Sequence, residues 1–222
     1  MKKFLVLLAE GFEEVEALTP VDYLRRAGLT VDTVSISGQR LVTGSHGVPV
    51  MADLCLDALK EEEYLGLYLP GGMPGSVHLR DDERVLNLVR RFTKENKIVS
   101  AICAAPIVIN AAGVVSDKKV TSYPSTAPQL TDIGSYVDDA LVVQDGNIIT
   151  GRGAAIAAYE AFHLIREICG PDVLEKVKEG IQQHKVCLLY TSDAADDGES
   201  VDLGGRRIIK KKFFKAEYGI RD

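Results

Sequence analysis

The sequence predicts an α/β protein whose mostly parallel sheet carries helices on both faces. Short runs rich in Val, Ile and Leu alternate along the chain with segments whose apolar residues follow helical spacing. Three of these runs, at 3–9, 64–69 and 97–102, are almost continuously apolar, as expected for strands buried on both faces of a parallel sheet. Because the working sites of such sheets lie at the carboxyl ends of their strands, we expect function in the three loops that follow.

Composition excludes several classes of protein. A chain of 222 residues, 46% hydrophobic and 26% charged, is sufficient for one soluble α/β domain. The formal net charge of −6 and the lack of an extended Lys/Arg run before residue 187 argue against a nucleic-acid partner. No apolar stretch is long enough to span a membrane. The four cysteines are scattered without metal-ligand spacing, so we expect no metal, no cofactor and a reducing, cytoplasmic location.

Periodicity and glycine positions predict the first elements. Gly11 ends the strand at 3–9, and a helix is expected over 13–27, ending at Gly28. The apolar residues of this helix recur at three-residue steps and are expected to face the core: Val15, Leu18, Val21 and Leu24. Alternation of apolar and polar residues then predicts a strand over 30–37.

The middle of the chain contains a predicted hairpin, a strand and a helix. Two glycines within 41–53 favour a hairpin, and the short apolar run 64–69 is the next strand. The segment 81–96 is amphipathic and is predicted to be a helix. Its inward residues are expected to be Val85, Leu88, Val89 and Phe92.

The last elements are a hairpin and two helices. Asp145-Gly-Asn147 supplies the turn of the hairpin. A helix over 154–169 ends at Gly170-Pro171, and a final helix over 172–183 is expected to be capped by Asp172.

Cys103 is the centre of the predicted site. The run 97–102 is a strand, and a helix begins near Pro106 and ends at Gly113, so Cys103 falls on the sharp turn between them. Such a turn raises the side chain above the sheet edge and points it at the free N–H groups of the helix, which predicts a lowered thiol pKa and a nucleophilic cysteine. The alternative is that Cys103 is a small buried hydrophobic residue.

Glu16 is the candidate proton donor. It lies in the first turn of the first helix, one residue off the apolar face, so its carboxyl group is expected to turn toward the strand ends. A carboxyl group buried beside a thiolate has a raised pKa and can donate a proton to the sulfur or to a substrate. Glu13 and Glu14 are expected instead to be surface groups that compensate the helix dipole.

Backbone N–H groups at the same edge are candidates for binding an oxyanion. Gly71 and Gly72 follow the strand at 64–69 and have no side chains to obstruct their N–H groups. Together with the N–H of Ala104 they would stabilise a negative charge on a substrate oxygen. A simple turn is the alternative for the glycine pair.

Five segments, in collinear order, closely resemble the ThiJ/PfpI superfamily, in the branch of the Parkinson-disease protein deglycase and its bacterial relatives. They are Ala9-Glu-Gly-Phe-Glu-Glu-Val-Glu-Ala17, Pro20-Val-Asp-Tyr-Leu-Arg-Arg-Ala-Gly28, Leu69-Pro-Gly-Gly-Met-Pro-Gly75, Ala101-Ile-Cys-Ala-Ala-Pro106 and Asp145-Gly-Asn-Ile-Ile-Thr-Gly-Arg-Gly153. The resemblance covers nearly all of 1–186. It implies a flavodoxin-like three-layer sandwich, a homodimer, and a reactive cysteine hydrogen-bonded to a protonated glutamate. The matching residues are Cys103 and Glu16, with Gly71, Gly72 and Ala104 as the backbone pocket.

The chain also departs from patterns in this superfamily. Peptidase-like members place a histidine directly after the cysteine, where this chain has Ala104, so a Cys–His protease is disfavoured. The deglycase has a histidine before a proline near its site, whereas this chain has Tyr123-Pro124. Tyr123 is expected either to line the pocket and hydrogen-bond a substrate oxygen or to be a packing aromatic residue.

Two functions agree with these residues and with the resemblance. The first is a cofactor-free glyoxalase III or protein deglycase that acts on small dicarbonyls such as methylglyoxal and on early adducts of glycated protein, with Cys103 as nucleophile and Glu16 moving protons. The second is a redox-sensing, stress-protective chaperone that uses the oxidisable Cys103. We favour the enzyme because oxidation of a thiol does not require a nearby acid or donors for an oxyanion, whereas catalysis on a dicarbonyl uses both.

The segment 187–222 is predicted to be foreign to the protein, leaving 1–186 as the domain. Cys187-Leu-Leu-Tyr-Thr-Ser192 can be encoded by TGT CTC TTA TAC ACA TCT, which resembles the end of a transposon used in sequencing libraries. Lys210–Lys212 resembles a poly-A run. We interpret 187–222 as a read-through tail that is expected to be disordered. The alternative is a native extension with a surface contact at Lys210–Lys212.

Overall fold

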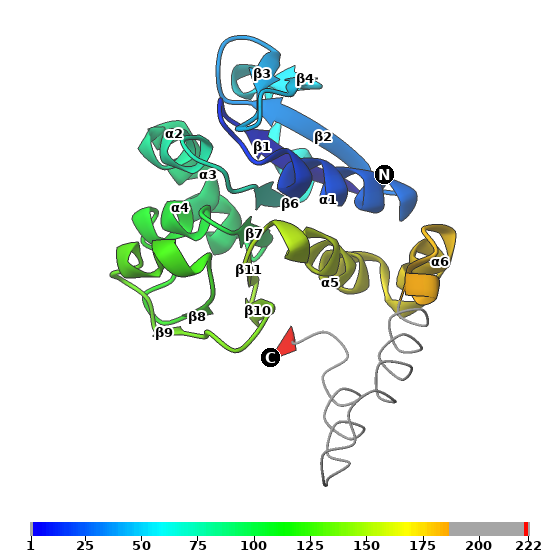
Figure 1. Ribbon diagram of the computed structural model, residues 1–222. Helices are drawn as coiled ribbons and strands as arrows, with labels where there is room; N and C mark the ends of the chain where they lie inside the picture. Colours follow the sequence, from blue (N-terminus) through cyan, green and yellow to red (C-terminus); the bar gives the residue numbers. More distant parts are fainter. Residues whose placement is uncertain (1, 187–219, 222) are drawn as a thin grey trace, which may run out of the picture.

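Eight strands form the central sheet of the computed structural model, which describes residues 2–186 and 220–221 (Figure 1). Their order across the sheet is β12-β10-β11-β7-β6-β1-β2-β5. Every neighbouring pair is parallel except β10 and β11, which form an antiparallel hairpin. The strands are β1 (Lys3–Leu8), β2 (Thr30–Ser35), β5 (Leu54–Cys55), β6 (Tyr64–Leu69), β7 (Ile98–Ile102), β10 (Val142–Asp145), β11 (Ile148–Gly151) and β12 (Ile220–Arg221).

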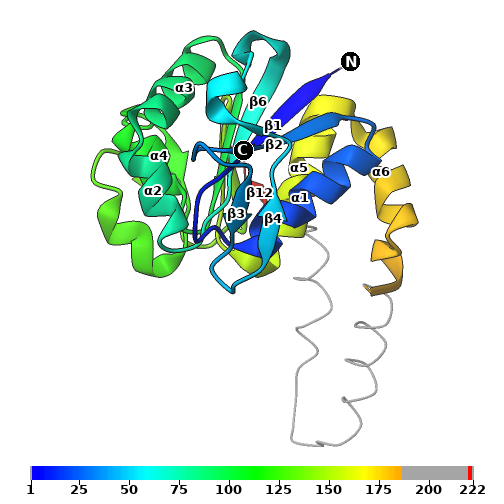
Figure 2. The same cartoon turned by 90° about the horizontal axis from the view of Figure 1, so that it is seen from above.

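Helices cover both faces of this sheet. Figure 2 shows α2, α3 and α4 on one side and α1, α5 and α6 on the other. The helices are α1 (Glu14–Arg26), α2 (Gly75–Asp81), α3 (Glu83–Lys94), α4 (Pro106–Ala111), α5 (Ala157–Cys169) and α6 (Pro171–Gly180). Short pairs lie outside the main sheet: β3 (Leu41–Thr43) with β4 (Pro49–Met51), and β8 (Lys119–Val120) with β9 (Ser135–Tyr136). This is the flavodoxin-like three-layer α/β sandwich that was expected, and the prediction is confirmed.

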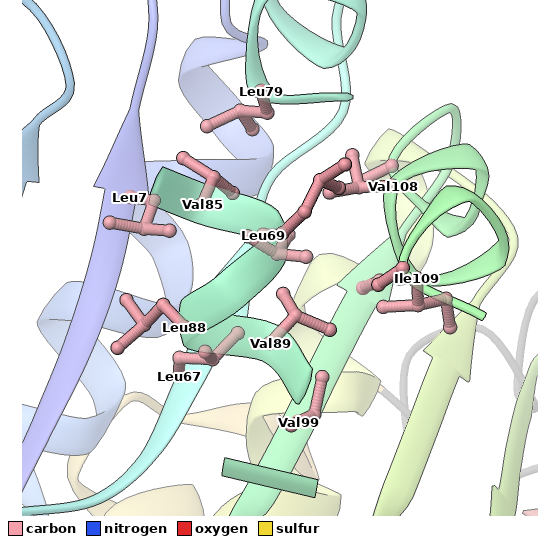
Figure 3. Close-up of a cluster of buried hydrophobic side chains, with 14 of the residues drawn as sticks. Leu7, Leu67, Leu69, Leu79, Val85, Leu88, Val89, Val99, Val108 and Ile109 are labelled. Carbon is pink, nitrogen blue, oxygen red and sulfur yellow. The ribbon is translucent and has the colours of Figure 1, made fainter. Parts of the chain in front are cut away.

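The apolar core on the α3 side shows why these segments pack as they do. Val85, Leu88 and Val89 lie on one face of α3 and pack against Leu7 of β1 and Leu67 of β6 (Figure 3). All five are buried, and each fully buried Leu or Val contributes about 1.5–3 kcal/mol relative to an exposed side chain. The second core lies between the sheet and α1, α5 and α6.

Two predicted helices differ in their boundaries. The helix expected over 81–96 is the single helix α3, which begins at Glu83 because the Asp82 carboxylate accepts a hydrogen bond from the Arg84 N–H, 2.9 Å away. The short helix α2 just before it, which ends at Asp81, was not expected. The last helix begins at Pro171, so Asp172 lies inside its first turn and Gly170 occupies the cap position. A proline is favourable at the first helical position, because an N–H at that position would have no acceptor within the helix.

The predicted inward face of α1 is wrong for its first half. Val21 and Leu24 are buried, but Val15 is 53% exposed and Leu18 is 37% exposed. Steps of three residues fall short of the 3.6-residue turn, so each step rotates the side chain by about 60°. Val15 and Leu24 therefore lie on opposite sides of the helix, and Ala17 packs inward in the first turns instead.

Ile220–Arg221 is the one described part of the predicted tail. It pairs with β10 at Val142 and Val143, at one edge of the sheet. The rest of the segment, 187–219 and residue 222, lies outside the described residues. Among the helices that the structure describes, none has the length and apolar character that a membrane crossing requires.

Candidate active site

Cys103 lies on a tight turn between β7 and α4. Its φ of 61° is in the left-handed region, which costs a non-glycine residue about 1–3 kcal/mol and persists only where the surroundings hold it. Two hydrogen bonds hold it here. The Cys103 N–H donates to the Gly151 carbonyl of β11 at 2.9 Å, and the Cys103 carbonyl accepts from the Tyr123 N–H at 2.8 Å. The turn thus has the geometry of a nucleophile elbow.

Glu16 reaches the same point from the first turns of α1. Its side chain is fully buried, and its Oε2 accepts a hydrogen bond from the Gly71 N–H at 2.9 Å. Gly71 itself lies between the two functional groups: a Cβ added there would be 2.5 Å from Glu16 Oε2 and 2.7 Å from Cys103 Cβ. Only glycine fits at this position. The structure thus brings Cys103, Glu16 and Gly71 together from three separate segments, at the carboxyl ends of the strands.

The electrostatics of this pair differ from the expectation. Burial raises the pKa of Glu16 to about 7, against the opposing effects of the neighbouring Cys103 thiol and of the hydrogen bond from the Gly71 N–H. Burial, followed by the charge of Glu16, also raises the pKa of the Cys103 thiol, so the predicted lowering is wrong. The Ala104 N–H does lower the thiol pKa, as the sequence suggested, but its effect is smaller than those of burial and Glu16. The sequence shows the helix that follows Cys103 but not how deeply the sulfur is buried.

The two groups therefore titrate as a unit. While Glu16 is ionised, its charge disfavours a thiolate beside it. Once Glu16 holds a proton, this repulsion disappears and the carboxyl group can donate a hydrogen bond to the sulfur. A reactive thiolate thus requires Glu16 in its protonated form.

The backbone donors around the pair are not equivalent. The Gly71 N–H already donates to Glu16, so it is not free for an oxyanion. The Gly72 N–H has no acceptor among the described residues, and the Ala104 N–H faces the Cys103 sulfur. Gly72 has a φ of 90°, and a Cβ there would be 2.4 Å from the Glu13 nitrogen, so this loop requires glycine at both positions.

Tyr123 lies beside the elbow through its backbone, and its side chain is 49% exposed. Its ring lies over Gly153, where an added Cβ would be 3.4 Å from the ring. The Tyr123 carbonyl accepts a hydrogen bond from Thr126 Oγ1 at 2.8 Å, which fixes the turn that follows. Because the ring is half exposed rather than buried, Tyr123 is not part of the core.

Among the described residues, one group of acidic and histidine side chains is close enough to hold a metal ion: Glu13, Glu14 and His46. Its atoms already bind one another. Glu14 Oε1 accepts from the backbone N–H of His46 at 2.8 Å, and Glu14 Oε2 lies 3.0 Å from His46 Nδ1. Glu14 was expected to be a surface group but is 7% exposed, because the β3–β4 hairpin folds over the start of α1.

Sequence reasoning missed a second buried carboxyl group near the site. Glu160 lies on α5, is fully buried, and accepts a hydrogen bond from Ser100 Oγ at 2.6 Å. A signal was present, since Glu160 is spaced with Ala157, Ala161 and Leu164 on the apolar face of its helix. A charged residue on such a face is rarely buried without a partner.

Comparison with known proteins agrees with this geometry. The sequence pattern of the DJ-1/PfpI family matches residues 2–167. Protein dj-1beta of Drosophila melanogaster is 39% identical over 180 residues, which cover 81% of this chain and 96% of that protein. A protein named a deglycase from Pyrococcus horikoshii is 37% identical over 151 residues, covering 68% of this chain and 89% of that protein.

Solved structures agree as well. The crystal structure of Drosophila melanogaster DJ-1beta superimposes with a TM-score of 0.79 at 38% identity, covering 82% of this chain and 97% of that one. The structure of Toxoplasma gondii DJ-1, described as oxidized, gives a TM-score of 0.76 at 30% identity and covers 82% of this chain and 98% of that one. The chain therefore belongs to the DJ-1/PfpI family.

Proposed function

We propose that this protein is a cysteine-dependent, cofactor-free glyoxalase III or protein deglycase that acts on reactive dicarbonyls such as methylglyoxal and on their early adducts with protein. The observation that carries the proposal is the pairing of the Cys103 thiol with the buried Glu16 carboxyl group, whose pKa of about 7 lets it hold or release a proton at neutral pH. The 37% identical Pyrococcus horikoshii protein named a deglycase supports the same chemistry.

The first step is attack on the aldehyde. Cys103 Sγ forms a bond to the aldehyde carbon of methylglyoxal as the carbon–oxygen π bond breaks. The thiol proton passes through Glu16 to the carbonyl oxygen, which gives a hemithioacetal and leaves Glu16 ionised. The Gly72 and Ala104 N–H groups are the donors for the oxygen as its negative charge develops.

The second step moves hydrogen within the substrate. Ionised Glu16 removes the proton from the former aldehyde carbon and returns it to the neighbouring carbon. The hydroxyl proton of the hemithioacetal moves to the oxygen on that neighbouring carbon, so that a thioester of lactic acid forms without an external oxidant. Water then hydrolyses the thioester, releases lactate and restores the thiol. With an early glycation adduct as substrate, the released amine is the repaired side chain.

The test is methylglyoxal consumption with identification of the product, using the full chain, Cys103→Ser and Glu16→Gln, with Glu167→Gln as a control on an exposed carboxyl group. We expect multiple turnovers to lactate in the full chain and in the control, and loss of turnover in the other two variants. Consumption that stops at one equivalent of methylglyoxal per protein would contradict the proposal.

A redox-sensing, stress-protective role is the second candidate. The structure described as oxidized for the 30% identical Toxoplasma gondii relative favours it. The Cys103 thiol, which is partly exposed and forms no disulfide with a described residue, favours it as well. Peroxide would convert this thiol to sulfenic and then sulfinic acid. Mass spectrometry after graded peroxide should find Cys103 oxidised before Cys55 and Cys169. Uniform oxidation of all three would remove this candidate.

We further propose a cytoplasmic homodimer. Val15 and Leu18 on α1 are exposed next to the β3–β4 hairpin, which exposes further apolar side chains: Leu41, Val48 and Met51. Such a patch is typical of a protein interface, and a second copy of the chain is the expected occupant. Leu18→Arg should then lower the mass measured by light scattering from that of two chains to one, while Leu65→Arg, outside the patch, should not. A monomeric parent chain would contradict the proposal.

A further inference from the structure

A second buried acid lies behind the Cys103 elbow. Glu160 is fully buried on α5, on the face of the sheet that α1 also covers. Ser100 Oγ donates to its Oε1 at 2.6 Å, whereas its Oε2 has no hydrogen-bond partner among the described residues. A carboxylate that accepts so few hydrogen bonds in an apolar surrounding is strongly disfavoured relative to the neutral acid.

Glu160 contacts both strands that hold the nucleophile. Ser100 is on β7, three residues before Cys103. Glu160 Oε2 lies against Gly151 of β11, where an added Cβ would collide with it. The Gly151 carbonyl is the acceptor for the Cys103 N–H. The carboxyl group therefore supports the elbow from inside the fold, through one hydrogen bond and one close contact.

A buried tyrosine connects Glu160 with the catalytic pair. Tyr68 of β6 is the cross-strand neighbour of Ser100, and its hydroxyl is also buried without a partner among the described residues. Burial and then the charges of Glu160, Glu16 and Cys103 raise the pKa of Tyr68. The Tyr68 hydroxyl is thus close enough to Glu160, Glu16 and Cys103 for the charge of each to affect its pKa. The charges of Glu160 and of the Glu16–Cys103 pair are therefore expected to influence one another.

The titratable groups that face Glu160 are few. Glu16 comes from α1 and Tyr68 from β6, while β7 and β11 contribute Ser100 and Gly151, which do not ionise between pH 5 and 10. Burial raises the pKa of Glu160 to about 8, the Ser100 hydrogen bond lowers it, and the charge of Glu16 raises it further. Glu16 ionises first as the pH rises, and Glu160 follows.

We propose that Glu160 is a positioning residue of the site, a neutral carboxyl group that supports the two strands holding Cys103 and whose proton is coupled to that of the Glu16–Cys103 pair. At neutral pH it adds no charge behind the thiol. Its ionisation in alkaline solution places a second negative charge near Glu16, which opposes formation of the thiolate. This inference extends the proposed function, but it concerns the reactivity of the thiol and not the identity of the substrate.

The test measures the rate of Cys103 alkylation by iodoacetamide from pH 5 to pH 10, followed by mass spectrometry of the Cys103 peptide in the full chain. Glu160→Gln keeps a neutral side chain of nearly the same shape and cannot ionise. We expect its alkylation rate to match that of the parent within about two-fold at pH 7 and to be about three-fold faster or more at pH 9. A decrease of about half a unit in the pKa of the Cys103 thiol raises the thiolate fraction by about that factor. Glu167→Gln, on the exposed side of α5, should follow the parent throughout.

Ser100→Ala provides a second variant with a distinct signature. Removing the hydroxyl takes away the hydrogen bond that favours the Glu160 carboxylate, so the alkaline inflection should move to higher pH. A purely structural role for the pair would change the melting temperature and leave the pH profile in place. Superimposable profiles for the parent, Ser100→Ala and a folded Glu160→Gln would overturn the inference. Because alkylation needs only the thiol, a protein without dicarbonyl turnover would still give a clear result.

Discussion

Glu14 and Glu16 lie two residues apart in the first turn of the same helix, and their acidities are shifted in opposite directions. Burial raises the pKa of Glu16 to about 7. Burial acts on Glu14 in the same sense, but hydrogen bonds from the His46 side chain and from the backbone N–H groups of Glu14, His46 and Val48 outweigh it and lower its pKa to about 2. Glu14 is therefore an anion throughout the physiological range, and Glu16 can exchange a proton there.

Hydrogen-bond donors, and not burial alone, therefore decide which of the two buried acids can exchange a proton near neutral pH. The β3–β4 hairpin surrounds Glu14 with N–H groups, and Glu14 in turn fixes the hairpin on α1. Glu16 receives one N–H from the described residues, that of Gly71, and lies beside the thiol. One acid anchors a loop, and its neighbour is kept protonatable.

The largest expected effect separates the two acids by activity. Glu16→Gln should lower kcat for methylglyoxal by about 10²–10⁴-fold, because the amide cannot move protons. Glu14→Gln should stay within about ten-fold of the parent, since Glu14 does not face the sulfur. Steady-state kinetics on both variants provides the measurement. Equal losses in the two would remove the functional distinction between them.

The next effect separates them by the pH dependence of stability. The pKa of Glu16 in the folded state, about 7, lies above the unfolded value of 4.5, so unfolding releases a proton between these pH values. The free energy of unfolding should therefore fall by up to about 3 kcal/mol as the pH rises from 4.5 to 7. Glu16→Gln should lack this contribution in urea titrations at a series of pH values. An identical slope in parent and variant would show that Glu16 is ionised in the folded protein.

Glu14 should contribute with the opposite sign. Its pKa is lowered to about 2, so its stabilisation is present above pH 4.5 and is lost as the pH falls toward 2. Because solvent near the hairpin screens the interaction, we expect about 1 kcal/mol. Denaturant titrations of Glu14→Gln at pH 7 and pH 3 should show a deficit at pH 7 that shrinks at pH 3. A deficit of the same size at both values would mean that shape, not charge, accounts for it.

The smallest expected effect concerns the segment after Val186. No contact to Glu14 or Glu16 in the described part of the chain comes from beyond residue 186, so a chain ending at Val186 should keep both pH dependences. We expect its melting temperature to stay within about 4 °C of the parent, because a lost contact worth less than about 1 kcal/mol shifts the transition of a chain of this size by no more than about 2–4 °C. Unfolding of the shortened chain would show that the segment belongs to the domain.

The sequence predicts the sheet well because its strands are decided by local pattern. The run 64–69 is a strand at these same residues, and the turn at Asp145-Gly-Asn147 joins β10 and β11 as expected. The elbow at Cys103 could also be predicted from the sequence, because a strand, a cysteine and a helix that begins with proline follow one another directly.

What the sequence could not supply depends on contacts between distant segments. The burial of Glu14 comes from a hairpin about thirty residues away. The raised thiol pKa comes from burial of the sulfur and then from the charge of a carboxyl group on another element. The cluster of Ser100, Tyr68 and Glu160 combines three elements. Charge and hydrogen-bond partners of this kind appear only when the chain is folded.

Nuclear magnetic resonance titration of the glutamate side-chain carboxyl carbons, with Glu14→Gln and Glu16→Gln used for assignment, would measure the acidity of the two groups directly. We expect the Glu16 carbon to titrate near pH 7 and the Glu14 carbon to titrate near pH 2. Two carboxyl groups that both titrate near their ordinary value of 4.5 would contradict this expectation.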